Sequence, residues 1–152
     1  MIKSLLFIII FFLSSQNSFC NEPVEDFYSL LSFLKNGKNI KCVISYGKCI
    51  LQEAETTESF PDITGGMDIS AWEYFPAGSI RNEKACIVFS ESILIHHYSR
   101  GAVINYVKVK VFENNTVEIN ARYFTPDDFE TVMNENFSGE LSNSNIKKGV
   151  SH

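Results

Sequence analysis

The stretch VINYVKVKVFENNTVEINARYF, residues 103–124, constrains the fold more than any other part of the chain. Apolar and polar residues alternate on both sides of its Glu-Asn-Asn segment, which is typical of two half-buried β-strands. The apolar positions are Val103, Val107, Val109 and Val111 on the first strand and Val117, Ile119, Ala121 and Tyr123 on the second. Both sets must face one core, so odd-numbered residues of one strand have to pair with odd-numbered residues of the other.

The length of the turn decides whether the chain reaches this register. A two-residue Asn-Asn turn would pair odd-numbered with even-numbered residues, whereas a three-residue loop, Glu113-Asn114-Asn115, places Val109 opposite Ile119. Such loops end in a residue with left-handed backbone, which asparagine tolerates, so we expect a positive φ at Asn115. On the outer face the same register pairs Lys110 with Glu118 and Tyr106 with Arg122.

The other elements are predicted from periodicity. Val24–Asn36 carries apolar residues at helical spacing, with Pro23 suited to the first turn and Gly37 to the C′ position. Runs that favour β structure predict strands near residues 39–45, 66–75, 84–89, 92–99, 102–112 and 116–125. Together they predict an α+β fold in which an N-terminal helix packs on a curved antiparallel β-sheet. A lipocalin-like, partly closed barrel is the alternative.

Two short motifs resemble ligand sites but have simpler structural interpretations. Gly65-Gly66 precedes a strand pattern rather than a helix, and no phosphate-loop pattern is present, so we interpret it as a tight turn or bulge leading into a strand. The segment Thr125-Pro126-Asp127-Asp128 is typical of the start of a short helix. Asp127, Asp128 and Glu130 are then acids of its first turn rather than metal ligands. We therefore expect no metal and no cofactor.

Residues 1–20 have the layout of a secretory signal. Lys3 is their only charge, an apolar run from Leu5 to Leu13 follows, and the polar SSQNS precedes a cleavage position after Cys20. The apolar run is too short to cross a bilayer, which needs about 20 residues. We expect residues 1–20 to be removed, residues 21–152 to form one secreted or periplasmic domain, and no membrane span to remain. Lipid attachment at Cys20 is the alternative, although bulky Phe19 stands where a small residue is expected.

Cleavage after Cys20 would leave three cysteines, Cys42, Cys49 and Cys86. Export permits disulfides, and a bridge between Cys42 and Cys49 forms if CVISYGKC turns back on itself. In the alternative interpretation all three are small buried apolar residues. A zinc site is disfavoured because there is no C-x-x-C and the histidines are not spaced to complete a ligand set.

Charge and motif content restrict the function. The net charge of −5 argues against a nucleic-acid partner and against attraction to anionic membranes. No nucleophile motif is present, and His96 and His97 would point to opposite faces of a strand. The candidate ligand-binding residues are Trp72 and Tyr74, which share one face of a predicted strand, and Tyr106 and Arg122 on the outer face of the hairpin.

The order of segments resembles the VirK family of small exported proteins. The chain carries FYSLLSFLKNGKNIKCVISYGKC, GGMDISAWEYF, IVFSES and NYVKVKVFENNTVEINARYF in this order and ends in GVSH. The matching positions are Gly37, Cys49, Gly65, Gly66 and Gly149-Val150. The family's second cysteine near the C-terminus has no counterpart, and Cys42 is an addition, so the family's cysteine arrangement is not carried over. The resemblance implies export and, in some bacteria, association with virulence gene sets; it implies no reaction and no active site.

These observations predict a non-catalytic exported protein that binds a small ligand or a host or envelope protein. An apolar cavity lined by Trp72, Tyr74 and the valines would favour a carrier of a lipophilic ligand. The alternative is a small secreted hydrolase or isomerase that uses His96 or His97 with a carboxylate, which a cleft holding a histidine beside an acid would favour.

Overall fold

The computed structural model of the chain describes residues 24–52, 62–141 and 146–148. The expected signal peptide and the Gly149-Val150 pair lie outside these ranges. The described elements, in chain order, are α2 (Phe27–Lys35), β1 (Ile40–Ser45), η1 (Tyr46–Lys48), β2 (Ile50–Gln52), β3 (Thr64–Asp68), β4 (Trp72–Phe75), β5 (Cys86–His97), β6 (Gly101–Phe112), β7 (Thr116–Phe124), β8 (Thr131–Glu140) and β9 (Ile146–Lys148).

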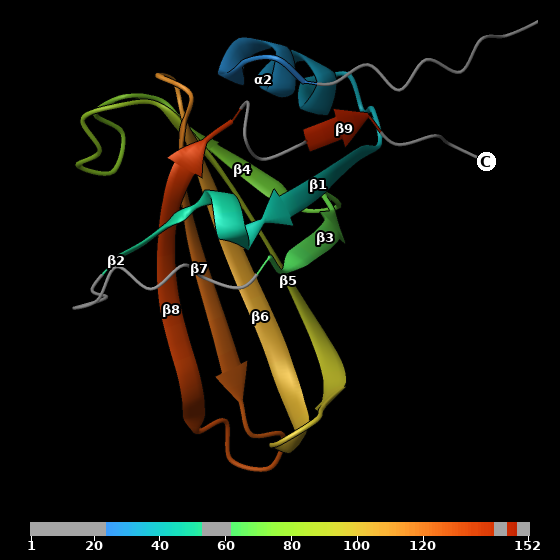
Figure 1. Cartoon of the computed structure of the whole chain (residues 1–152). Coiled ribbons are helices and arrows are strands. Elements are labelled where there is room, and N and C mark those ends of the chain that lie inside the picture. The colour runs from blue at the N-terminus through green and yellow to red at the C-terminus, as the bar shows by residue number, and fades with distance from the viewer. Residues whose placement is uncertain (1–23, 53–61, 142–145, 149–152) are drawn as a thin grey trace, which may run out of the picture.

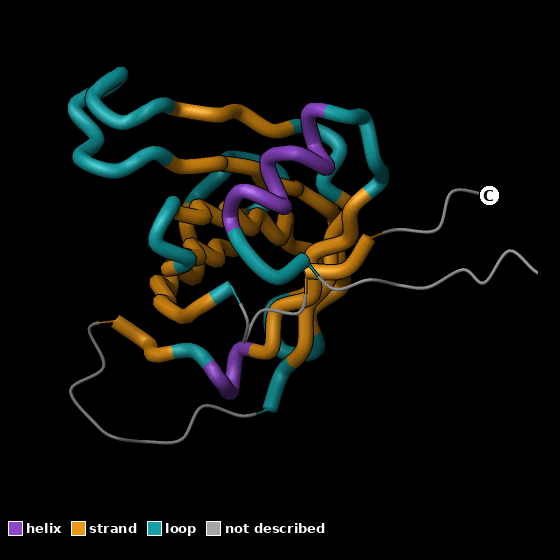
Figure 2. The backbone as a smooth tube through the Cα atoms, turned by 90° about the horizontal axis from the view of Figure 1, so that it is seen from above, coloured by secondary structure: helices purple, strands orange, loops and turns teal. Residues whose placement is uncertain are grey.

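The strands form two sheets. The larger has six strands in the order β2-β8-β7-β6-β5-β4, and the smaller has three in the order β3-β1-β9. Figure 1 shows β1 and β3 crossing one face of the long strands, with α2 above them, and Figure 2 shows the same layers from above. The predicted α+β fold is confirmed. The barrel alternative is wrong, because β2 and β4 end the large sheet at opposite edges and the sheet does not close.

Helix α2 begins three residues later than the sequence pattern predicts. Asp26 is the N-cap, and its carboxylate accepts a hydrogen bond of 2.7 Å from the backbone N–H of Ser29. At the other end Gly37 has φ of +66°, and its amide bonds to the carbonyl oxygen of Leu34 at 3.0 Å. The amide of Lys38 donates a hydrogen bond of 3.0 Å to the carbonyl oxygen of Phe33. This bond completes a Schellman motif and confirms Gly37 at C′. The buried face of the helix consists of Phe27, Leu30 and Leu34.

The hairpin β6–β7 is confirmed in register and in turn geometry. Val109 is opposite Ile119, Lys110 is opposite Glu118 and Tyr106 is opposite Arg122. Asn115 has φ of +65°, and its amide closes the loop on the carbonyl of Phe112 at 2.9 Å. The odd-numbered residues of both strands therefore face the core.

Two predicted strand boundaries are wrong. The strand expected at 66–75 is divided into β3 and β4, which belong to different sheets, because the chain crosses from the small sheet to the large one at residues 69–71. The strands expected at 84–89 and 92–99 are one continuous strand, β5, paired with β6 along its whole length. Ser90 and Glu91, which lie between the two predicted ranges, are an ordinary part of that strand.

The predicted helix after Thr125 is also wrong. Thr125–Glu130 is a tight turn, closed by a hydrogen bond of 2.9 Å from the amide of Glu130 to the Thr125 hydroxyl. The Thr125 hydroxyl also bonds to the Asp128 carboxylate, and this bond lowers the pKa of that carboxyl. Phe129, which follows these acids, has φ of +58° and is exposed. The chain then continues as β8, which pairs with β7.

Cys42, Cys49 and Cys86 are free thiols among the described residues, and the predicted bridge between Cys42 and Cys49 is not present. Cys42 lies in the middle of β1, between Met67 of β3 and Ile146 of β9, so the segment runs on instead of turning back. Burial raises the pKa of the Cys42 thiol to about 12. The Cys49 thiol instead approaches the carbonyl oxygen of Ser45, at 3.6 Å. The alternative interpretation, a buried apolar cysteine, fits Cys42 and Cys86.

Candidate functional site

A cavity of about 400 Å³ lies between the small sheet and the inner face of the large sheet. This volume is in the range of small-molecule sites, about 300–1,000 Å³. Its floor consists of Glu91, Ile93 and His97 of β5, Asn105 and Val107 of β6, Ala121 and Tyr123 of β7 and Met133, Glu135 and Phe137 of β8. Its opposite wall consists of Ile44, Tyr46, Ile63, Thr64, Gly65, Gly66 and Met67, and Tyr98 also borders the cavity.

The register of the long strands arranges the floor in lateral rows. The first row, Phe89-Val109-Ile119-Phe137, is buried in the hydrophobic core. The second row is Glu91-Val107-Ala121-Glu135, and the third is Ile93-Asn105-Tyr123-Met133. The cavity therefore begins where the core ends, with an apolar centre and a carboxylate on each side.

The two glutamates of the second row have no counter-charge. Both are half-buried, and neither side chain has a hydrogen-bond or ion-pair partner among the described residues. The described residues that line the cavity include no lysine or arginine. The site therefore carries two unpaired negative charges over an apolar floor, which favours a cationic group on any ligand.

Tyr46 closes the wall of the cavity from η1. Its ring packs edge-on against Phe137 of the floor, with ring centroids 5.0 Å apart. Burial raises the pKa of the Tyr46 phenol to about 12, so the hydroxyl stays protonated at neutral pH. A Cβ atom on Gly65 would lie 3.2 Å from the Tyr46 ring, so the glycine leaves space for this aromatic wall.

The predicted role of Gly65-Gly66, a tight turn or bulge that leads into a strand, is wrong. Both glycines lie inside β3, opposite Ile44 and Val43 of β1, rather than in a turn before a strand. Neither glycine has a positive φ, so the backbone conformation does not require glycine at these two positions. Their place is in the wall of the cavity.

The adjacent histidines point to opposite faces, as predicted, and His97 is the one that lines the cavity. Its Nδ1 accepts a hydrogen bond of 3.3 Å from the Ser99 amide and lies 3.2 Å from the Ser99 hydroxyl. Its ring stacks near Tyr98 and Tyr123, with centroid distances of 4.7 and 5.4 Å. Among the described residues, His97 makes no hydrogen bond or ion pair with a carboxylate, so this part of the chain holds no histidine–carboxylate dyad at His97.

The four candidate ligand-binding residues lie in two separate places, Trp72 and Tyr74 beside the core and Tyr106 and Arg122 on the outer face. None of the four lines the cavity. Trp72 and Tyr74 are half-buried beside the core, and Tyr74 lies near Phe27 and Lys35 of the helix. Tyr106 and Arg122 are opposite each other on the outer face of the large sheet, as predicted.

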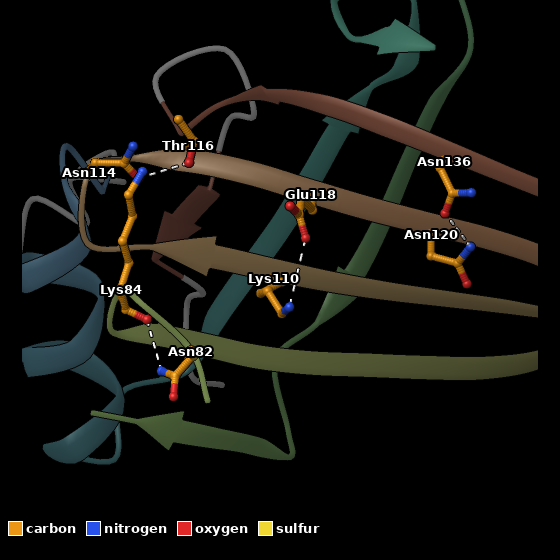
Figure 3. A network of polar contacts seen from close by, with 8 residues as sticks. All are labelled: Asn82, Lys84, Lys110, Asn114, Thr116, Glu118, Asn120 and Asn136. Atoms are coloured by element: carbon orange, nitrogen blue, oxygen red, sulfur yellow. Dashed lines mark hydrogen bonds and ion pairs between the residues drawn. The ribbon is translucent and has the colours of Figure 1, made fainter. Parts of the chain in front are cut away.

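The outer face has a polar hollow of about 220 Å³. It is lined by Gln52, Lys108, Lys110, Glu118, Ile119, Asn120, Arg122, Asn136 and Phe137. Figure 3 shows the Lys110–Glu118 ion pair, 3.8 Å long, and the 2.8 Å hydrogen bond from Asn120 to Asn136 on neighbouring strands. Arg122 Nε donates to Asn134 at 3.0 Å, so the polar groups of this face largely bind one another.

Sequence reasoning missed the two cavity glutamates, although a signal existed. In CIVFSESILIHH, Phe89, Glu91 and Ile93 are alternate residues and share one face if the segment is a single strand. The pattern then places a carboxylate on an apolar face. Glu135 stands in the same way between Met133 and Phe137 in β8, a strand that the sequence analysis did not predict.

The described residues offer no group of three histidine, cysteine or acidic side chains able to hold a metal ion. Within the same residues, no helix has the length and apolar character needed to cross a membrane.

Comparisons with known proteins agree with this architecture. The family model described as VirK protein matches residues 23–129. A crystal structure of a VirK family protein from Legionella pneumophila has the same fold, with a TM-score of 0.64 and 13% sequence identity over 82% of this chain and 96% of that one. No curated protein matches the chain. Since the family model covers more than half of the sequence, the chain belongs to the VirK family.

Proposed function

We propose that the protein is an exported, non-catalytic binding protein whose ligand is a small molecule with an apolar body, held in the cavity between the two sheets. The observation that carries the proposal is the cavity itself, with its apolar floor and its unpaired carboxylates. Three large apolar side chains at the cavity, Ile63, Ile93 and Tyr98, are exposed to solvent. Exposed apolar groups beside a concave surface are typical of ligand sites.

Export is proposed on the sequence of residues 1–20 and on the likeness to exported VirK proteins, some of which are associated with virulence gene sets. We expect the mature chain to begin at Asn21 or within a few residues of it. Mass analysis of the protein from its own cells tests this. A major species that retains Met1–Cys20 would overturn the proposal.

A catalytic function, hydrolysis or isomerisation through His97, is the second candidate. It is favoured by the presence of His97 and two glutamates in one cavity. Binding is the better supported function, because the His97 imidazole is held by Ser99 rather than by a carboxylate that could orient it for proton transfer.

Ligand binding is tested with Nile red, an uncharged dye that fluoresces in apolar sites. The wild-type protein is expected to bind the dye saturably. Ala121→Leu, which adds apolar volume to the cavity floor, should lower the affinity about tenfold, or about 1.4 kcal/mol. Ser90→Leu on the outer face of β5 is the control and should leave the affinity unchanged. Equal effects of the two variants, or no saturable binding, would contradict the proposed site.

A further inference from the structure

We infer that the ligand of the cavity is a linear aliphatic dication, whose two ammonium groups pair with Glu91 and Glu135 while its methylene chain lies on the floor between them. This inference rests on the proposed binding function and specifies the chemistry of the ligand. It follows from the strand register, the lining and the absence of counter-charges at these two carboxylates.

The register places the two glutamates at the ends of one row. Glu91 is opposite Val107, Val107 is opposite Ala121, and Ala121 is opposite Glu135. Three strand spacings separate the outer members of the row, which is roughly 14 Å between Cα atoms on a flat sheet. We therefore expect an extended chain of several methylene groups to reach from one carboxylate to the other.

The surface between the carboxylates suits methylene groups. Val107 and Ala121 are the residues of the row between the acids, and the buried first row lies beside them. An aliphatic chain on this floor removes apolar surface from water, and this burial favours binding. A ligand with polar groups along its whole length would leave them without partners there.

The ends of the site suit cations. The two carboxylates are half-buried and unpaired, and the described lining has no lysine or arginine that would attract an anion. Asn105 and Tyr123 in the neighbouring row and Thr64 on the wall provide further oxygen atoms near the floor. An ammonium group donates up to three hydrogen bonds, so it needs such acceptors in addition to one carboxylate.

A single cation would leave one of the two carboxylates uncompensated. A dication of suitable length neutralises both, and each contact is stronger in the partly desolvated cavity than at an exposed site. The two charges and the apolar floor thus favour a dication over a fatty amine with one charge, and over a fatty acid.

The experiment is isothermal titration calorimetry with octane derivatives of matched length: diaminooctane, octylamine and octanediol. Diaminooctane is expected to bind about tenfold more tightly than octylamine. Glu91→Gln and Glu135→Gln, each isosteric with the native residue, should each lower the affinity for diaminooctane about fivefold to tenfold, towards that of octylamine.

Glu73→Gln is the matched control, because it removes the same charge from an exposed position on the outer side of β4. It should leave the affinity for diaminooctane unchanged. If it weakens binding as much as Glu91→Gln does, the effect comes from the net charge of −5 and the inference is wrong.

The outcomes separate this inference from the proposed function. In one outcome octylamine and octanediol bind, Ala121→Leu lowers their affinity, and diaminooctane binds no more tightly than octylamine. The cavity is then a ligand site, but the inference that its ligand is a dication is wrong. If Nile red and all three octane derivatives fail to bind, the proposed function and the inference are both overturned.

Discussion

The four long strands β5 to β8 have two chemically different surfaces, because alternate residues of each strand point to opposite faces of the sheet. The inner face has the buried core row and then the row with Glu91 and Glu135. The outer face has Lys108, Lys110 and Arg122 together with Glu118 and amide side chains. Two acids on the inner face are thus separated by one layer of backbone from charges of both signs on the outer face.

The charges on the two faces differ in how they are compensated. On the outer face Lys110 pairs with Glu118, and Arg122 donates to Asn134, so these groups stabilise one another at an exposed surface. On the inner face the two glutamates are half-buried and have no such partners in the described part of the chain. This contrast is why we place the ligand on the inner face, although both faces are hollowed.

The largest expected difference between the faces concerns stability. Ile119→Ala removes a side chain of the buried row and should lower the free energy of unfolding by about 2–4 kcal/mol. Lys108→Ala, at an exposed position of the paired strand, should change it by less than about 0.5 kcal/mol. Urea denaturation measures both. Similar losses in the two variants would contradict the assignment of inner and outer faces.

The next largest effect concerns Asn115, whose loop sets the register and so decides which residues reach each face. Its side-chain oxygen accepts a hydrogen bond of 2.8 Å from the Phe27 amide at the start of α2. Asn115→Gly keeps the positive φ but loses this bond, at a cost of about 1 kcal/mol. Asn115→Val also forces a β-branched residue into left-handed backbone and should cost about 2–3 kcal/mol.

Denaturant midpoints of the two Asn115 variants are compared with the wild type. If the Gly variant is as stable as the wild type, the bond to Phe27 contributes nothing and the backbone conformation alone explains the asparagine. If the Val variant is equally stable, the loop does not set the register.

The hairpin β6–β7 was predictable because several local signals agree. The alternation of apolar residues, the loop length and the charge pair Lys110–Glu118 all select one register. The second role of Asn115 was not predictable, since its partner Phe27 lies 88 positions away in the sequence. The left-handed backbone alone would suit glycine equally well at this position, and the hydrogen bond to the helix gives asparagine an advantage.

Strand β8 was not predictable from local signals. Thr125-Pro126-Asp127-Asp128 has the residues of a helix start, and the same residues also form a tight turn in which the Thr125 hydroxyl accepts from the Glu130 amide. The strand that follows is polar and becomes ordered by pairing with β7, which is a tertiary effect. Without β8, Glu135 could not be assigned to a face.

The site was only partly accessible from the sequence for the same reason. The cavity lies between two sheets whose strands are distant in the chain, so local patterns gave neither its walls nor its volume. The pairing of Tyr106 with Arg122 was predicted correctly, but it lies on the outer face. The two glutamates become visible once β5 and β8 are each recognised as one strand with alternating faces.

The smallest expected effect is the coupling between Lys110 and Glu118. Their charged atoms are 3.8 Å apart, both side chains are substantially exposed, and Lys110 also lies over the Phe112 ring at 5.3 Å. A double-mutant cycle with Lys110→Met and Glu118→Gln should give a coupling energy of about 0.2–0.5 kcal/mol. Solvent and mobile ions screen such a pair, so the coupling should fall towards zero as salt is raised to 1 M, where the Debye length is about 3 Å.

This measurement gives the strength of a solvated ion pair on the outer face, with which the charge interactions on the inner face of the same sheet can be compared. The tenfold preference expected for diaminooctane over octylamine corresponds to about 1.4 kcal/mol, which exceeds the outer coupling because the inner carboxylates are partly desolvated. A Lys110–Glu118 coupling above about 1 kcal/mol that is insensitive to salt would mean that the outer pair is shielded from water as well. Burial would then no longer distinguish the charges of the two faces, and the choice of the inner face as the binding site would lose its electrostatic basis.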